Sequence, residues 1–390
     1  MIKNRYITDA IHDDLSEKMV FIGGPRQVGK TTLSKDIIAP EYESSKYYNW
    51  DNRDDRKDIL KPGWPGSAAL LIFDEIHKYK NWKSFIKGEY DKLKDQYKFL
   101  ITGSARLDLY RRGGDSMLGR YHYYRLHPFS LAESCSIKNN IKPLTELNIP
   151  LKSETKNFLS LDKFGGFPEP FIKQNSKTLR RWHNERVERI TREDIRDITA
   201  IRDFSGMILF CDMLPDRAGS LLSINSLRED LEVSHKALSN WLNIMESFYY
   251  CFRIYPYVGS NFRSLKKEPK LFLWDWSEIK DEAARFENLI ACHLLKLVHF
   301  LKDYEGYKVD LYYLRNAQKK EVDFLVTYDG KPWFAIEAKL NRTTVSPNLY
   351  YYSSKLDIPF LFQVVKKKEV DILIEKVRVI SADRFLLALI

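Results

Sequence analysis

A glycine-rich segment near the N-terminus has the residue types and the spacing of a phosphate-binding loop. An apolar run at residues 19 to 22 leads into GPRQVGKT, residues 24 to 31, which fits G-x-x-x-x-G-K-[ST] at every fixed position. Glycines let backbone N–H groups approach phosphate oxygens, Lys30 can reach the β and γ phosphates, and the Thr31 hydroxyl can bind Mg²⁺. A chance glycine-rich turn is the alternative interpretation. The residues that we expect to contact the nucleotide are Gly24, Pro25, Arg26, Gln27, Val28, Gly29, Lys30, Thr31 and Thr32.

An acid pair follows the next strand-like segment. AALLIFDEIHK, residues 68 to 78, is a continuous apolar run that is typical of a buried parallel strand, and it leads into Asp74 and Glu75. Ligands of open α/β sheets bind at the carboxyl ends of the strands. We therefore expect Asp74 to hold Mg²⁺, directly or through water, and Glu75 to orient and deprotonate the attacking water. The alternative is that both acids only cap the following helix.

Two further groups of residues are candidates for phosphoryl-transfer chemistry. YKFLITGSAR, residues 97 to 106, offers Thr102 and Ser104 at a strand end, where they could contact the γ-phosphate or the attacking water; a plain turn at Gly103 explains them almost as well. Further on, Arg120 follows a glycine and precedes a Tyr-rich strand. Arg120, or else Arg106, could face the nucleotide of a neighbouring chain, and an ordinary surface salt bridge is the alternative role.

The C-terminal third carries a second set of charged residues with a chemical pattern. Glu287 lies on the apolar helical segment at residues 281 to 301, Asp323 lies in the strand-like EVDF, and Glu337 and Lys339 lie in IEAK on the next strand. This order of helix acid, strand acid and E-x-K is the series of the PD-(D/E)xK restriction-endonuclease-like fold. Carboxylates at one sheet edge hold Mg²⁺ there, and the lysine stabilises the attacking hydroxide or the developing phosphorane charge. A simple exposed Glu–Lys ion pair is the alternative, and a nuclease-like fold can also serve only as a binding module.

The segment between these two sets reads as two helices followed by strands. In residues 223 to 258 a first helix, a turn at Val233 and Ser234 and a second helix to about Ser247 are predicted. The expected core residues at helical spacing are Leu227, Leu231, Leu238, Trp241, Leu242 and Met245.

This pattern, with a basic wing at Lys266 and Lys267, is that of a winged helix that could bind DNA. The second helix offers few DNA-reading residues, namely His235, Lys236 and Asn240. A packing or assembly module is therefore the alternative.

Six motifs in order resemble a known group of proteins: GGPRQVGKTTL, NWDNRDD, LLIFDEIHKYKNWKSFIKGEYD, FLITGSARL, LGRYHYYRLHPFSLAE and GGFPEP. Together they resemble the bacterial and archaeal AAA-type ATPases that carry a C-terminal segment of long-unassigned function, over nearly the whole chain. The resemblance implies ATP and Mg²⁺ as cofactors, with Lys30, Thr31, Asp74 and Glu75 at the nucleotide and the metal. Arg120 matches the arginine of the G-R element in that group. No second-sensor arginine motif of the standard AAA+ lid is found, and Asp275-Trp276-Ser277 stands where relatives often read D-x-G.

Composition sets limits on the rest. The chain has 390 residues, a net charge of +10 and 44% hydrophobic residues, which favours two or three globular domains and is compatible with DNA or another nucleic acid as partner. The four cysteines lie far apart without a CxxC pair, which suggests a reducing compartment. No signal peptide or membrane span is evident, so we expect a cytoplasmic protein with no membrane partner, and a homo-oligomer as a possible assembly.

The expected fold class is α/β: a P-loop NTPase parallel sheet, a helical connector and winged helix, and a C-terminal restriction-endonuclease-like α/β domain. The boundaries that we predict are 1–150 for the ATPase domain, 151–215 for the helical connector, 216–280 for the winged helix and 281–390 for the nuclease-like domain.

Overall fold

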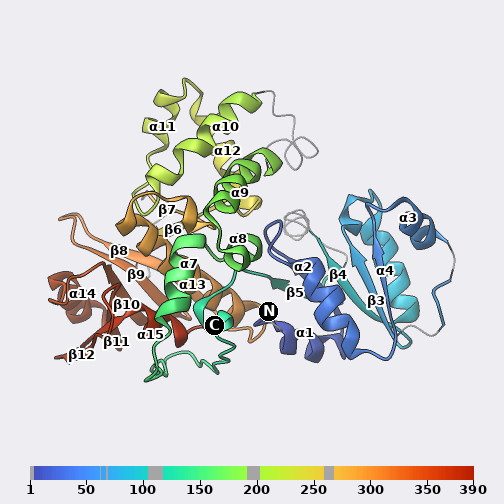
Figure 1. The fold of residues 1–390 in the computed structure, drawn as a ribbon, viewed down its shortest axis with the longest axis horizontal. Helices are drawn as coiled ribbons and strands as arrows, with labels where there is room; N and C mark the ends of the chain where they lie inside the picture. The colour runs from blue at the N-terminus through green and yellow to red at the C-terminus, as the bar shows by residue number, and fades with distance from the viewer. Residues whose placement is uncertain (1–3, 62, 67–68, 104–116, 191–202, 259–267) are drawn as a thin grey trace. The chain divides into compact units, whose positions relative to one another are not determined.

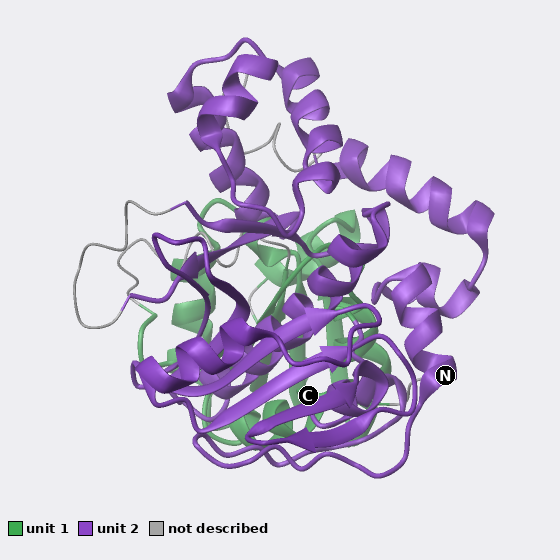
Figure 2. Ribbon diagram, turned by 90° about the vertical axis from the view of Figure 1, so that its left-hand side faces the viewer, with its two compact units in different colours: residues 1–128 green, residues 129–390 purple. Residues whose placement is uncertain are grey.

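The structure is a computed structural model, and it describes the chain except for residues 1–3, 62, 67–68, 104–116, 191–202 and 259–267. Two compact units make up the chain: unit 1 is residues 1–128 and unit 2 is residues 129–390 (Figure 2). This single division falls after Pro128, and the finer boundaries expected from the sequence stay a prediction.

Within its described residues, unit 1 is built on a parallel sheet of five strands in the order β2-β3-β4-β1-β5. The strands are β1 (Met19–Gly23), β2 (Ser45–Asn49), β3 (Leu70–Asp74), β4 (Lys98–Thr102) and β5 (Tyr121–Arg125). The described helices are α1 (Thr8–Leu15), α2 (Lys30–Thr32), the wider π-helical turn η1 (Leu33–Ile38), α3 (Arg53–Leu60), α4 (Trp82–Leu93) and the 3₁₀ turns η2 (Ala39–Glu41) and η3 (Ile76–Lys78). β1 and β3 are buried at every position, as their uninterrupted apolar runs predict for central parallel strands.

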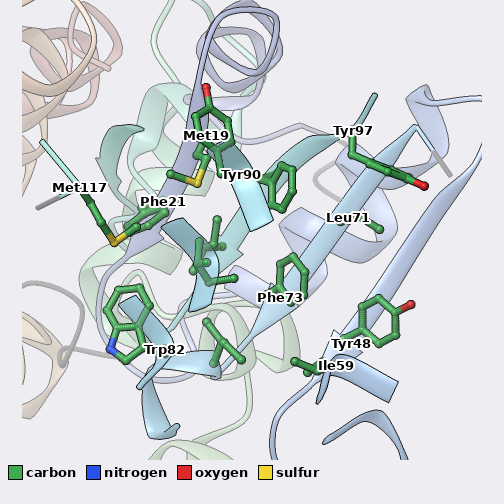
Figure 3. Close-up of a cluster of buried hydrophobic side chains, with 14 of the residues drawn as sticks. Met19, Phe21, Tyr48, Ile59, Leu71, Phe73, Trp82, Tyr90, Tyr97 and Met117 are labelled. Carbon is green, nitrogen blue, oxygen red and sulfur yellow. The ribbon is translucent and has the colours of Figure 1, made fainter. Parts of the chain in front are cut away.

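One face of this sheet packs against α4. Every second residue of a strand points to the same face of the sheet. Phe21 of β1 and Phe73 of β3 point to the face that α4 covers, and they join Trp82 of α4 in one buried cluster (Figure 3). The Phe21 and Trp82 rings have centroids 6.0 Å apart. This packing fixes the strands whose carboxyl ends carry the polar residues of the first site.

Unit 2 contains a mixed sheet of eight described strands in the order β12-β13-β11-β10-β9-β8-β6-β7. The strands are β6 (Cys251–Pro256), β7 (Lys270–Leu273), β8 (Val309–Arg315), β9 (Glu321–Tyr328), β10 (Lys331–Lys339), β11 (Phe360–Val365), β12 (Asp371–Ile374) and β13 (Val377–Ser381). The larger described helices are α7 (Thr155–Phe164), α9 (Ser176–Arg189), α10 (Phe204–Met213), α11 (Ile224–Asp230), α12 (His235–Ser247), α13 (Glu282–Asp303) and α14 (Pro347–Leu356). The shorter ones are α6 (Leu131–Ser134), α8 (Pro168–Lys173), η5 (Pro215–Arg217), η7 (Trp276–Glu278) and α15 (Ala382–Leu387).

Two strands of this sheet, β9 and β10, and the long helix α13 carry the C-terminal charged series. β9 pairs antiparallel with both β8 and β10, and β10 pairs parallel with β11 on its other side. α13 precedes these strands in the chain (Figure 1). Its N-terminus is capped by the Asp281 carboxylate, which accepts a hydrogen bond from the Ala284 N–H. The acids of the series therefore come from one helix and two adjacent antiparallel strands.

The helix pair in the middle of the chain forms as the sequence pattern predicts. α12 begins after the N-cap Ser234 and ends at Ser247, and five of the six expected core residues are buried while Leu231 is half-buried. The strands after it are part of the large sheet: β6 pairs antiparallel with β7 and, further along, parallel with β8. Lys266 and Lys267 of the expected wing lie outside the described residues. His235, Lys236 and Asn240 are exposed.

The expected α/β fold class is confirmed: unit 1 has a P-loop NTPase parallel sheet, and unit 2 adds a mixed sheet with helices. None of the helices in the described part of the chain has the length and apolarity that crossing a bilayer requires. All four cysteines are free thiols.

Candidate functional site

The glycine-rich segment of unit 1 forms a loop between β1 and α2 in which three residues take positive φ angles. Gly24 has φ +135°, Gln27 has φ +59° and Gly29, the N-cap of α2, has φ +96°. A Cβ atom on Gly24 would lie 2.5 Å from the Leu126 carbonyl oxygen, so only glycine fits there. Turns of this kind point successive N–H groups into one concavity, which is the geometry that binds phosphate oxygens.

The Lys30 side chain folds back over this loop. Its Nζ donates to the carbonyl oxygens of Gly24 at 3.0 Å and Pro25 at 2.7 Å, and the residue is only 7% exposed. The buried ammonium is thereby fixed beside the backbone that would hold the phosphates. The contact of Lys30 with the β and γ phosphates stays a prediction.

Asp74 lies at the carboxyl end of β3 and accepts hydrogen bonds from three hydroxyl groups. The Thr31 hydroxyl donates to its Oδ2 at 2.8 Å, Tyr47 donates to the same oxygen at 2.7 Å, and Thr102 donates to Oδ1 at 2.5 Å. The strand register explains two of them. Thr102 is the β-pair of Asp74 on one side, and Tyr47 lies two residues before Asn49, the β-pair of Asp74 on the other side, so Tyr47 points to the same face as Asn49. A Thr hydroxyl 2.8 Å from a carboxylate supplies the hard oxygen donors that Mg²⁺ prefers, so Thr31 and Asp74 fit that metal.

Glu75, the residue after Asp74, has an unusual backbone conformation. Its φ of +57° places it in the left-handed region, which few non-glycine residues occupy and which is enriched at functional sites. The carboxylate lies 3.4 Å from His77 Nε2 and 3.7 Å from Lys78 Nζ. Burial raises the pKa of Glu75 above its ordinary value, with Lys30 opposing and Asp74 adding to the shift. A carboxylate of raised pKa is a better proton acceptor, which suits a general base.

Two residues of this site carry no local sequence signal. Tyr47 reaches Asp74 only because β2 pairs with β3. Arg5, which is 5% exposed, donates from Nη1 to the Val28 carbonyl at 2.8 Å and from Nη2 to the His127 carbonyl at 2.5 Å. Arg5 thus connects the loop at Val28 to the backbone at His127, and no spacing in the sequence links Arg5 to Val28.

The remaining candidates of unit 1 have different outcomes. Thr102 is fully buried and directs its hydroxyl to Asp74, so it orients that carboxylate. Ser104 and Arg106 lie outside the described residues. Arg120 forms a two-point ion pair with Asp91 of α4, Nε to Oδ1 at 2.7 Å and Nη2 to Oδ2 at 3.1 Å.

In unit 2 the predicted acids come together with a lysine that the sequence series does not contain. Lys270 of β7 places its Nζ 2.9 Å from Glu287, 2.7 Å from Glu321 and 3.4 Å from Asp323. Asp323 also accepts from the Ala338 N–H at 2.9 Å. The cluster therefore joins α13, β7, β9 and β10.

The Glu337–Lys339 pair lies beside this cluster on β10. Lys339 Nζ is 2.8 Å from Glu337 Oε1, while Glu337 Oε2 is buried with no hydrogen-bond partner among the described residues. Burial raises the pKa of Glu337 to about 7, Asp323 adds to the shift and Lys339 opposes it. Burial likewise raises the pKa of Glu287 to about 8, Asp323 adding and Lys270 opposing.

Burial alone would lower the pKa of Lys270, but the charges of Glu287, Asp323 and Glu321 outweigh it and raise that pKa, so the side chain is an ammonium. Within the described part of the chain, no group of three or more His, Cys, Asp or Glu side chains is placed to hold a metal ion. The four residues of the series are thus close in space, and each has a protein partner: Lys270 for Glu287 and Asp323, and Lys339 for Glu337.

Three segments of the chain match known families. Residues 16–135, which include most of unit 1, match the family described as AAA domain, so this part of the chain is similar to AAA-type domains. Residues 158–277 and 283–357 match two families described as domains of unknown function, DUF8612 and DUF4143.

The relatives found by sequence are themselves uncharacterized. A protein of Mycobacterium tuberculosis is 22% identical over 339 residues, covering 83% of this chain and 71% of the relative. One of Methanocaldococcus jannaschii is 23% identical over 301 residues, covering 67% and 61%. Among solved structures, a mutant of Thermotoga maritima RuvB matches with 16% identity and a TM-score of 0.30, covering 63% of this chain and 88% of that one.

Proposed function

We propose that this protein is a Mg²⁺-dependent ATPase whose unit 1 binds and hydrolyses ATP. The observation that carries the proposal is the hydrogen bond between the Thr31 hydroxyl and the Asp74 carboxylate. Thr31 is the last residue of the glycine-rich segment, and the Lys30 side chain is folded over the loop that this segment forms. Backbone N–H groups of the loop bind the β and γ phosphates, and Lys30 neutralises their charge. Thr31 and Asp74 would hold Mg²⁺, which when bound neutralises charge on the phosphate oxygens.

Glu75 is the residue to which we assign proton transfer. Its carboxylate accepts the proton of the attacking water, and the raised pKa makes it a stronger base than an exposed glutamate. The left-handed backbone at Glu75 sends its side chain in a different direction from that of Asp74, so one acid orients water while its neighbour holds the metal.

The test of this function is ATP turnover by paired variants. Glu75→Gln should still bind ATP and lose phosphate release by about 10²-fold or more, because general-base catalysis contributes that much. Lys30→Ala should lose binding as well. Glu17→Gln, at an exposed acid of the same unit, is the matched control and should keep wild-type turnover. Unchanged turnover in Glu75→Gln would refute the role given to Glu75.

For Arg120 we propose the role of an arginine supplied to the nucleotide of a neighbouring chain. Arg120→Ala should then lower turnover, whereas Asp91→Ala, which removes its partner in the ion pair, should not. Mixing Arg120→Ala protein with Lys30→Ala protein should restore part of the activity, because the mixture contains interfaces that combine one intact loop with one intact arginine. If Arg120→Ala and Asp91→Ala lose the same fraction of ATP turnover and mixing restores none of it, Arg120 only pairs with Asp91.

For unit 2 we propose contact with nucleic acid. Support comes from the order of helix acid, strand acid and E-x-K, which α13, β9 and β10 keep, and from the net charge of +10. Two versions are open to test: metal-dependent cutting of DNA, or an ATP-controlled switch or assembly protein in which a nuclease-like domain only binds. The ammonium of Lys270 among the acids favours the second version.

A panel of linear and branched DNA and of RNA, incubated with Mg²⁺ or Mn²⁺ and with or without ATP, separates the two versions. Cutting that Glu337→Ala or Lys339→Ala abolishes, with ATP turnover unchanged, supports the nuclease. Glu369→Ala, at an exposed acid of unit 2, is the control. DNA that stays intact with every metal but is retained by the protein in a low-salt binding assay supports the binding module, and no retention contradicts both.

A further inference from the structure

Lys270 lies among the acids of unit 2, in the place where those acids would have to bind a metal ion. It is a residue of β7, and its side chain is 2% exposed. Its Nζ contacts Glu287 from α13 and both Glu321 and Asp323 from β9, at 2.9, 2.7 and 3.4 Å. An ammonium has three N–H donors, so these three carboxylates account for all of them.

The acids have further partners within the chain, although Glu337 Oε2 has no hydrogen-bond partner among the described residues. Arg315 pairs with Glu321, the Ala338 N–H donates to Asp323, and Lys339 pairs with Glu337. In each case a proton donor of this chain already occupies carboxylate lone pairs. A divalent metal would need those same lone pairs at about 2.0–2.6 Å.

A neighbouring loop closes off the helix acid. A Cβ atom added to Gly219 would lie 3.3 Å from Glu287 Oε2, so the backbone at Gly219 covers this carboxylate. The Gly219 N–H donates to the Leu271 carbonyl at 2.8 Å, which attaches the loop to the strand that carries Lys270. Lys270 and the Gly219 backbone, which lies against Glu287, thus belong to one hydrogen-bonded arrangement.

Charge makes the lysine and a metal ion mutually exclusive in this place. Buried carboxylates need a compensating cation, and Lys270 supplies it inside the chain. A divalent cation bound to Glu287 and Asp323 would lie beside the positively charged Nζ, which contacts both carboxylates, and like charges repel more strongly in a buried site than in water. The residues present do not fit a metal between Glu287 and Asp323.

We propose that the Lys270 ammonium replaces the divalent cation in the acidic cluster of unit 2, so that this cluster is a metal-free, internally neutralised site. The inference rests on the proposed likeness of this site to a nuclease centre, and it selects the version in which unit 2 binds without cutting.

The experiment measures Mn²⁺ binding to the full chain without nucleotide, by calorimetry and by the EPR signal of free Mn²⁺. Wild-type protein should have no Mn²⁺ site that Asp323→Asn removes. Lys270→Met, which keeps an unbranched side chain as far as Cε and removes the charged Nζ, should gain one Mn²⁺ site with an affinity raised about tenfold or more. Adding Asp323→Asn to Lys270→Met should abolish that site.

Two further variants keep the test decisive. Lys270→Arg retains the cation and should bind no Mn²⁺ in unit 2, while Lys270→Gln serves as the neutral variant if the methionine protein does not fold. A Mn²⁺ site in the wild-type chain that Asp323→Asn removes would overturn the inference, as would a folded neutral variant without any gain. Failure of the proposed function looks different, since it appears as DNA that is neither bound nor cut, whatever the Mn²⁺ result.

Discussion

Asp74 and Glu75 show how neighbouring carboxylates acquire different chemistry. Three hydroxyl groups donate to Asp74, which fixes both of its oxygens, while the left-handed backbone at Glu75 turns the next carboxylate toward His77 and Lys78. Hydrogen bonds of this kind stabilise a charged carboxylate, and burial disfavours one. In the roles that we propose, the environment and not the residue type therefore separates the acid assigned to the metal from the acid assigned to proton transfer.

His293 of α13 gives a pH dependence of stability whose sign follows from its surroundings. Its Nδ1 donates to the Leu289 carbonyl at 2.8 Å and its Nε2 accepts from the Leu131 N–H at 3.0 Å, so the neutral ring fits. Burial lowers its pKa from 6.5 to about 4, with the Leu289 hydrogen bond opposing and Lys296 adding to the shift. Because the unfolded state then binds more protons between these two values, the free energy of unfolding falls as the pH drops from 6.5 to 4, by about 3 kcal/mol at most.

The measurement is urea denaturation at pH 7 and at pH 4.5. Wild-type protein should lose about 2–3 kcal/mol more between the two pH values than His293→Gln, whose amide oxygen can still accept from Leu131 and does not titrate. His235→Gln, at an exposed histidine of the same unit, is the control and should behave as wild type. Identical pH responses of His293→Gln and wild type would contradict this assignment.

At the scale of elements, the turn before α8, which contains Gly165, packs closely against the segment after β7, which contains Asp275. Asp275 is fully buried and accepts from Trp182 Nε1 at 2.7 Å, from the Ser277 hydroxyl at 2.6 Å and from the Ser277 N–H at 3.1 Å. Gly165 has φ +74°, and a Cβ atom there would lie 2.6 Å from Asp275 Oδ1. The serine of Asp275-Trp276-Ser277 thus has a structural role, since it supplies two of the donors that satisfy the buried aspartate.

Gly165→Ala should therefore destabilise unit 2 more than strain in the backbone alone explains. Gly165 has φ +74° and ψ 179°, a backbone region that only glycine readily occupies, so an alanine there costs about 1–3 kcal/mol, and overpacking against Asp275 adds about 1–3 kcal/mol. Gly330→Ala is a matched control in the same unit, because Gly330 has φ +77° with nothing within 4 Å of an added Cβ. Chemical denaturation of both variants measures the difference in their free energies of unfolding. Equal losses would mean that the turn at Gly165 shifts to accommodate the new methyl group.

Much of the fold was predictable where one segment holds all the information. The phosphate loop, the acid pair at the end of β3 and the end of α12 at Ser247 follow from local patterns of glycine, apolar and capping residues. Tyr47 and Lys270 could not be found in this way, because each meets its carboxylates only through strand pairing or through contact with a distant helix. Periodicity states which face a residue occupies and not which strand lies beside it.

At the scale of the whole molecule, the two sheets belong to separate compact units with separate cores. The described strands of unit 1 pair only with each other, and so do those of unit 2. One apolar cluster gathers around Phe73 in unit 1 and another around Leu325 in unit 2. Units with their own sheet and core unfold as separate cooperative transitions.

Calorimetry of the full chain should accordingly show two transitions, only one of which depends on nucleotide. A non-hydrolysable ATP analogue with Mg²⁺ at about 100 times its dissociation constant stabilises the state that binds it by about 2.7 kcal/mol, which raises the Tm of a unit of this size on the order of 10 °C. Lys30→Ala should abolish that shift and leave the other transition in place. Gly165→Ala should lower the other transition without changing the nucleotide response, because Gly165 and Asp275 both lie in unit 2. A single transition that nucleotide moves as a whole would show that the units unfold together.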